Sequence, residues 1–245
     1  ERITDLYLQT AGEVATQKGW PRFLTTACYN FRLSFDKQIL LYAQRPDATA
    51  VLPIEGRQGW NQRFGRWVNR GSKGIAILDS DSNGQARIKY YFDIADTHEG
   101  RHPRPVPIWT VHPEQEQAIM ETLENSFGVL GNTNTLGDAL ISAASNAMED
   151  NFQDYLAQLI YYKEGSFLEP LDEESLEAIF KPLLQNSIGY MLLVRCGIDP
   201  SQHFTSEDFS YISGFNTLQT INALGTATSD ISQMCLSEIA RTVLS

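Results

Sequence analysis

The sequence is poor in the residues that mark disulfide-rich, zinc-binding and membrane-spanning proteins. Its 245 residues include three cysteines and four histidines, with no CxxC spacing and no HExxH motif. These absences argue against a disulfide framework and a zinc site, and we interpret the cysteines as reduced, mostly buried thiols. No run approaches 18 apolar residues, so no membrane-spanning helix is predicted. No GxxxxGK[ST] motif is present either, which argues against nucleotide hydrolysis.

A secretory signal is also missing, because no basic region followed by an apolar one opens the chain. With few cysteines, this predicts a cytoplasmic location. The chain starts at Glu1 rather than Met, so we expect a segment of a longer protein. Hydrophobic residues make up 42% and charged residues 20%, which is typical of a globular protein.

Positive charge is scarce in the second half of the chain. Residues 111–245 contain 4 Lys and Arg against 19 Asp and Glu, whereas residues 1–110 contain 15 against 11. The balance is therefore −15 in the second half and +4 in the first. The first half can approach a polyanion, and the second half would repel one.

Apolar periodicity and turn residues predict an α+β fold in two parts. Residues 1–107 are expected to form a small mixed module, with helices near 1–17 and 34–44 and a β-hairpin of strands 75–78 and 87–94. Gly19-Trp20-Pro21 is expected to end the first helix. Residues 98–107 are predicted to form a linker. Residues 108–245 are expected to form an acidic helical domain, with helices at about 114–127, 136–148, 150–163, 173–196, 205–213 and 217–243.

The segment from Arg57 to Leu78 contains no carboxylate, although the whole chain has a net charge of −11. It carries five cations and three aromatic rings: Arg57, Arg63, Arg66, Arg70, Lys73, Trp60, Phe64 and Trp67. Cations can pair with a phosphate backbone, and flat rings can stack on unpaired bases. The alternative is a solvated basic face with both tryptophans buried in a small core.

Three stretches resemble the N-terminal domain of ArdC-type antirestriction proteins. Residues 30–50 (NFRLSFDKQILLYAQRPDATA) are similar to its opening N…S..NQ.LIYAQ.P.AT pattern. Residues 60–78 (WNQRFGRWVNRGSKGIAIL) are similar to its W…GR.V.KGEKGI.IL core, and residues 91–97 (YFDIADT) to its closing VFDVSQT strand. The chain also resembles the large ArdC-like proteins of Gram-positive conjugative elements.

This resemblance implies a single-stranded DNA-binding module used in plasmid or transposon transfer. The contact candidates that it implies by motif position are Asn30, Gln38, Arg66, Arg70 and Lys73. Family members often carry a zincin-like metallopeptidase domain after this module, and residues 184–196 resemble the helix that follows the metal motif there. Because this chain has no HExxH and that helix lacks the acidic ligand, we expect at most a metal-free relic of the zincin-like fold.

We therefore predict a non-enzymatic, bacterial, single-stranded DNA-binding protein without a cofactor or a bound metal. Its predicted contact residues are Asn30, Gln38, Arg57, Trp60, Arg63, Arg66, Trp67, Arg70 and Lys73. The acidic half would dock a basic protein partner. The main alternative is an antirestriction module whose acidic half imitates DNA and occupies a restriction enzyme. A metal-dependent peptidase is the third hypothesis.

Overall fold

Three helices open the chain in the computed structural model, which describes residues 2–245. They are α1 (Arg2–Val14), α2 (Gly19–Ala27) and α3 (Phe35–Gln44). Residues 19–21 were expected to end the first helix, but α1 ends at Val14 and Gly19 begins α2. Proline is tolerated in the first turn of a helix, where its missing N–H has no intrahelical partner to lose.

Two small antiparallel sheets follow. The first has the order β1 (Val51–Pro53), β4 (Ala86–Asp93), β3 (Ile75–Ser80), and the second pairs β2 (Arg66–Val68) with β5 (Thr97–Glu99). Short turns of π-helix (Trp60–Phe64) and 3-10 helix (Ile94–Asp96) lie between strands. The predicted β3–β4 hairpin is confirmed, and Asp81 closes its turn by accepting hydrogen bonds from the Asn83 and Gln85 amides. The β2–β5 pair was not predicted, and it places His98 and Glu99 in a strand rather than in the linker.

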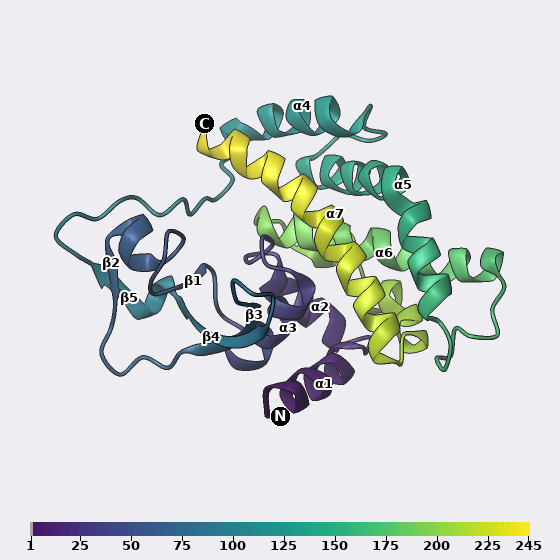
Figure 1. Ribbon diagram of the computed structural model, residues 1–245. Coiled ribbons are helices and arrows are strands. Elements are labelled where there is room, and N and C mark those ends of the chain that lie inside the picture. The colour runs from purple at the N-terminus through teal and green to yellow at the C-terminus, as the bar shows by residue number, and fades with distance from the viewer. Residues whose placement is uncertain (1) are drawn as a thin grey trace.

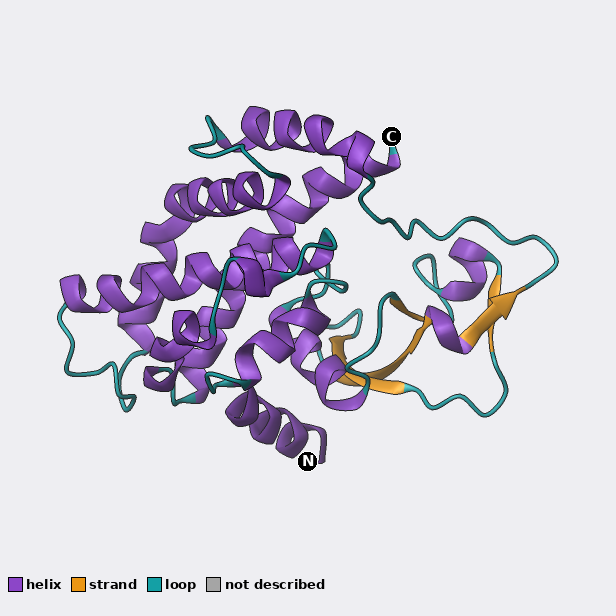
Figure 2. Ribbon diagram, turned by 180° about the vertical axis from the view of Figure 1, so that it is seen from behind, coloured by secondary structure: helices purple, strands orange, loops and turns teal. Residues whose placement is uncertain are grey.

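The rest of the chain is helical. Its long helices are α4 (Glu116–Phe127), α5 (Leu136–Tyr162), α6 (Glu173–Arg195) and α7 (Leu218–Leu244), with 3-10 turns at Pro113–Gln115, Pro200–Gln202 and Ser206–Gly214. The helix starts follow local capping, because Thr135, Asp172 and Thr217 each accept a backbone N–H three residues on. The two helices expected at 136–148 and 150–163 form the single helix α5, since no glycine or proline separates them. Figures 1 and 2 show the strands gathered on one side of the helices.

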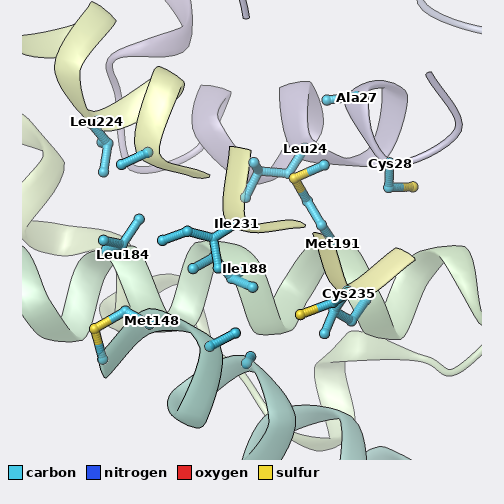
Figure 3. Close-up of a cluster of buried hydrophobic side chains, with 14 of the residues drawn as sticks. Leu24, Ala27, Cys28, Met148, Leu184, Ile188, Met191, Leu224, Ile231 and Cys235 are labelled. Carbon is cyan, nitrogen blue, oxygen red and sulfur yellow. The ribbon is translucent and has the colours of Figure 1, made fainter. Parts of the chain in front are cut away.

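One hydrophobic core extends across the predicted boundary at residue 107. Buried side chains of α1, α2 and α3 belong to the same cluster as those of α4 to α7. Figure 3 shows Leu24 of α2, Met191 of α6 and Ile231 of α7 together in this cluster. The buried indole N–H of Trp20 donates to Ser187 Oγ of α6 at 2.8 Å. The α+β fold class is therefore confirmed, but the first three helices share their core with the helical half.

The strands depend on two smaller clusters. One packs Ile75, Ile77 and Tyr91 against Leu40 and Leu41 of α3. The other contains Trp60, Phe64 and Phe92. Adjacent residues of β4, Tyr91 and Phe92, thus fill opposite sides of the sheet. Within residues 2–245, no helix combines the length and the apolar character needed to cross a membrane.

Candidate nucleic-acid interface

Trp60 is a core residue of the strand layer. Its side chain is fully buried, and its indole N–H donates to the Phe92 carbonyl at 2.8 Å. Its ring packs at 5.8 Å from that of Phe64, in the π-helical turn that Gly65 ends with a φ of 61°. The prediction that Trp60 stacks on a base is inconsistent with this burial, because the ring presents no surface to a ligand.

Asn30 and Gln38 are also buried, which corrects the contact role that the resemblance implied. The Asn30 amide donates to the Ala48 carbonyl at 3.0 Å, and the Gln38 amide donates to the Asn30 carbonyl at 3.1 Å. Both side chains thus satisfy backbone groups between α2, α3 and the approach to β1. Buried amides paired in this way specify the fold, and their burial leaves them little surface for a phosphate to contact.

Arg66 ties the second sheet together. Its Nε donates to Thr97 Oγ1 at 2.8 Å, its Nη2 to the Thr97 carbonyl at 3.3 Å, and its Nη1 lies 3.6 Å from Glu99 Oε1. The side chain is partly buried. A phosphate would have to compete with Glu99 for this guanidinium, so Arg66 is the least accessible of the five predicted cations.

The other four cations of the segment are exposed: Arg57, Arg63, Arg70 and Lys73. None of them lies within 4.0 Å of a carboxylate oxygen of residues 2–245. Arg63 donates to Gln58 Oε1 at 2.9 Å, and its guanidinium carbon lies 5.0 Å from the Phe64 ring centroid. These side chains keep donors available for an external anion.

Two further arginines lie close to this group, and sequence reasoning did not include them. Arg104 Nη1 donates to the carbonyls of Gln62 and Arg63 at 3.1 and 3.3 Å. Partial burial lowers the pKa of Arg32 below its ordinary value, and the nearby positive charge of Arg63 lowers it further. Sequence spacing could not place these two arginines near Arg63, because Arg32 precedes α3 and Arg104 lies in the predicted linker.

Of the two tryptophans predicted to stack on bases, only Trp67 has a ring that a ligand can reach. Its side chain is 51% exposed on β2, opposite His98 of β5. A side chain at Gly100 would collide with its indole nitrogen, so that glycine gives the ring its place beside β5. The loop that follows, residues 69–74, is held by hydrogen bonds from Asn69 N to the Asp96 carbonyl and from Ser72 N to the Asn69 carbonyl.

The helical half leaves its acidic charge largely unneutralised. Of its four cations, Lys181 pairs with Glu149 and Glu177, and Arg241 pairs with Glu238. Lys163 donates to the Leu171 carbonyl. Arg195 is buried. We call the exposed cations Arg57, Arg63, Arg70 and Lys73 the basic edge; they and the acidic helices give the molecule surfaces of opposite charge.

The potential metal ligands and the thiols of the described residues were the remaining candidates for chemistry. No group of three or more His, Cys, Asp or Glu side chains within residues 2–245 is placed to hold a metal ion. All three cysteines are free and buried, as the sequence predicted. Burial raises the pKa of Cys28, Cys196 and Cys235 to about 12, so none of them supplies a thiolate near neutral pH.

Comparison of the chain with protein-family models, curated proteins and solved structures found no match.

Proposed function

We propose that this protein binds single-stranded DNA without enzymatic activity, in the transfer or protection of a mobile genetic element. The observation that carries the proposal is one segment, residues 57–73, with four exposed cations that have no carboxylate partner in residues 2–245 and a half-exposed Trp67. The resemblance to ArdC-type proteins supports the choice of ligand.

A single strand fits this surface better than a duplex. Trp67 can stack only on a base whose face is free, and paired bases in a duplex hide their faces. The cations stand on loops and a short turn rather than along a helix that could enter a major groove. A contact made of backbone pairing and stacking predicts little preference for sequence.

Charge also decides how the ligand approaches. A phosphate chain is attracted to the basic edge and repelled by the acidic helices, so the strand is confined to one side of the molecule. If all four exposed cations pair with phosphates, the logarithm of affinity should fall with the logarithm of salt concentration with a slope of about −3.

The test is fluorescence anisotropy with labelled oligothymidylate and a duplex of equal length, across a salt series. We expect tighter binding of the single strand, and we expect Arg70→Glu with Lys73→Glu to weaken it strongly. The matched control is Lys18→Glu with Arg22→Glu, which makes the same charge change at two exposed cations of the α1–α2 region.

If the control pair weakens binding as much as the Arg70 and Lys73 pair, the interaction depends on net charge and this site is wrong. If the unaltered protein binds no oligothymidylate at low salt, the proposed function is wrong.

A further inference from the structure

Tyr90 is the other large ring left open on the strand side of the molecule. It is 58% exposed in the middle of β4, and Ile88 on the same strand is 50% exposed. Alternate residues of a strand share a face, so Ile88 and Tyr90 lie on the face of Phe92. The Trp60 cluster covers Phe92 but leaves Tyr90 open.

The opposite face of β4 carries a buried tyrosine, in contrast to the face that carries Tyr90. Tyr91 is buried against the α3 side of the sheet, where its hydroxyl donates to Asp79 at 3.2 Å. The fold thus buries one tyrosine and presents the adjacent one to solvent. A half-exposed aromatic ring on a sheet face is the usual platform for an unpaired base.

The loop of residues 69–74, which carries Arg70 and Lys73, runs between the two exposed rings of Trp67 and Tyr90. Residues 69–74 begin just after Trp67 and Val68 and end at Gly74, where an added Cβ would lie 3.0 Å from Tyr90 Cδ1. Gly74 therefore rests directly against the Tyr90 ring. Arg70 and Lys73 lie between the two ends. Figure 1 shows this stretch running from β2 in the second sheet to the three-stranded sheet.

The reach of the chain limits the distance between the rings. Six residues lie between Trp67 and Gly74, and the seven Cα-to-Cα steps of an extended chain span at most about 25 Å. Binding modules for single strands cover about four or more nucleotides. One short oligonucleotide can therefore contact both rings.

We propose that Tyr90 is a second base-stacking platform, so that a single strand lies along residues 69–74 with bases on Trp67 and Tyr90 and phosphates on Arg70 and Lys73. This inference rests on the proposed function and adds a contact residue and a path for the strand. The unpaired cations between the rings favour an anionic ligand, and the two flat rings favour nucleobases over an acidic peptide.

The test compares Tyr90→Ala, Tyr90→Phe and Tyr211→Ala in the full chain, with labelled oligothymidylate of about 12 nucleotides. Tyr211 is the control because it is 51% exposed on the helical half. We expect Tyr90→Ala to weaken binding at least about fivefold with an unchanged salt slope, because stacking releases no counterions. Tyr90→Phe and Tyr211→Ala should bind like the unaltered protein.

The outcomes separate the two proposals. If the unaltered protein binds and Tyr90→Ala binds equally well, Tyr90 is not a platform and the proposed function stands. The stacking role is also overturned if Tyr90→Phe loses as much as Tyr90→Ala, or if polyglutamate competes as well as unlabelled oligothymidylate. If the unaltered protein binds no single strand, the proposed function itself fails.

Discussion

Gly225 of α7 gives a direct test of the core that joins the first helices to the helical half. An added Cβ at this position would overlap the ring atoms Cε2 and Cζ of Phe35 in α3. Phe35 cannot move aside freely, because its ring packs edge-on against Phe23 at 5.5 Å and lies 6.2 Å from Trp20. We therefore predict that Gly225→Ala destabilises the protein.

The size of the effect follows from two opposing contributions. Forcing an extra methyl group into a close-packed core costs about 1–3 kcal/mol. Alanine is a better helix former than glycine by about 1 kcal/mol, which offsets part of that cost. The difference is a net loss of roughly 0–2 kcal/mol in the free energy of unfolding, and we expect about 2 kcal/mol because two aromatic neighbours hold Phe35 in place.

Gly12→Ala is the matched control. Gly12 lies inside α1, and an added Cβ there would meet no atom within 4 Å. This substitution gains the helix preference without the overlap, so it should stabilise the protein by about 0.5–1 kcal/mol. The same chemical change should thus have opposite signs at the two positions.

Urea unfolding followed by both circular dichroism and tryptophan fluorescence measures the difference. Three of the four tryptophans (Trp20, Trp60 and Trp67) lie in α2 and the strand region, so fluorescence reports mainly on the first part of the chain, whereas circular dichroism is dominated by α5, α6 and α7. One shared core predicts coincident transitions. If Gly225→Ala is as stable as Gly12→Ala, or if the two probes show separate transitions, the packing of α3 against α7 is not what joins the two halves.

Two further predictions concern buried groups. Arg195 stacks 3.4 Å from the Trp109 ring centroid and donates to the Trp109 carbonyl, while its Nε has no partner in residues 2–245. Arg195→Ala should cost about 3 kcal/mol through the lost packing and the cavity, and Arg195→Met should cost clearly less in the same urea assay, since it restores volume without an unpaired buried charge. The buried thiols predict alkaline sensitivity. Unfolded thiols lose their protons near pH 9 and folded ones near pH 12, so the unfolded state binds fewer protons and stability should fall as pH rises through this interval. A melting temperature that stays constant across that interval would contradict the burial of Cys28, Cys196 and Cys235.

Local signals predicted the helices well. Ser34 correctly marked the start of α3, and Gly197 lies just beyond the end of α6, with a φ of 78°. Such signals involve neighbours in sequence, so they can be read without the fold. The β2–β5 pair could not be read in this way. Its strands have three residues each, too few for alternation to appear, and they meet through pairs such as Arg66 with Glu99.

Contacts between residues distant in sequence also limited the prediction of the candidate nucleic-acid interface. The exposure of Arg57, Arg70 and Lys73 followed from composition, because unpaired cations remain in water. The fates of Trp60 and Trp67 did not follow, since both rings lie in similar polar surroundings along the chain. Trp60 is buried because it packs with Phe64 and with Phe92, 32 residues away, whose carbonyl also accepts its N–H. The exposure of Tyr90, the proposed second platform, could not be predicted, because it depends on how far along its own face of β4 the Trp60 cluster extends beyond Phe92.

The shared core changes what the charge asymmetry means for binding. Two independent modules would let the basic half be cut out and studied alone. Here the first three helices bury Trp20, Phe23 and Leu24 against the helical half, so a fragment of residues 1–107 would expose that apolar face to water. The acidic helices are therefore held at a fixed position relative to residues 57–74 rather than on a flexible linker. If the protein binds single-stranded DNA as proposed, their negative field would act on the approaching nucleic acid from a fixed direction. At low salt, it opposes any path except the one along the basic edge.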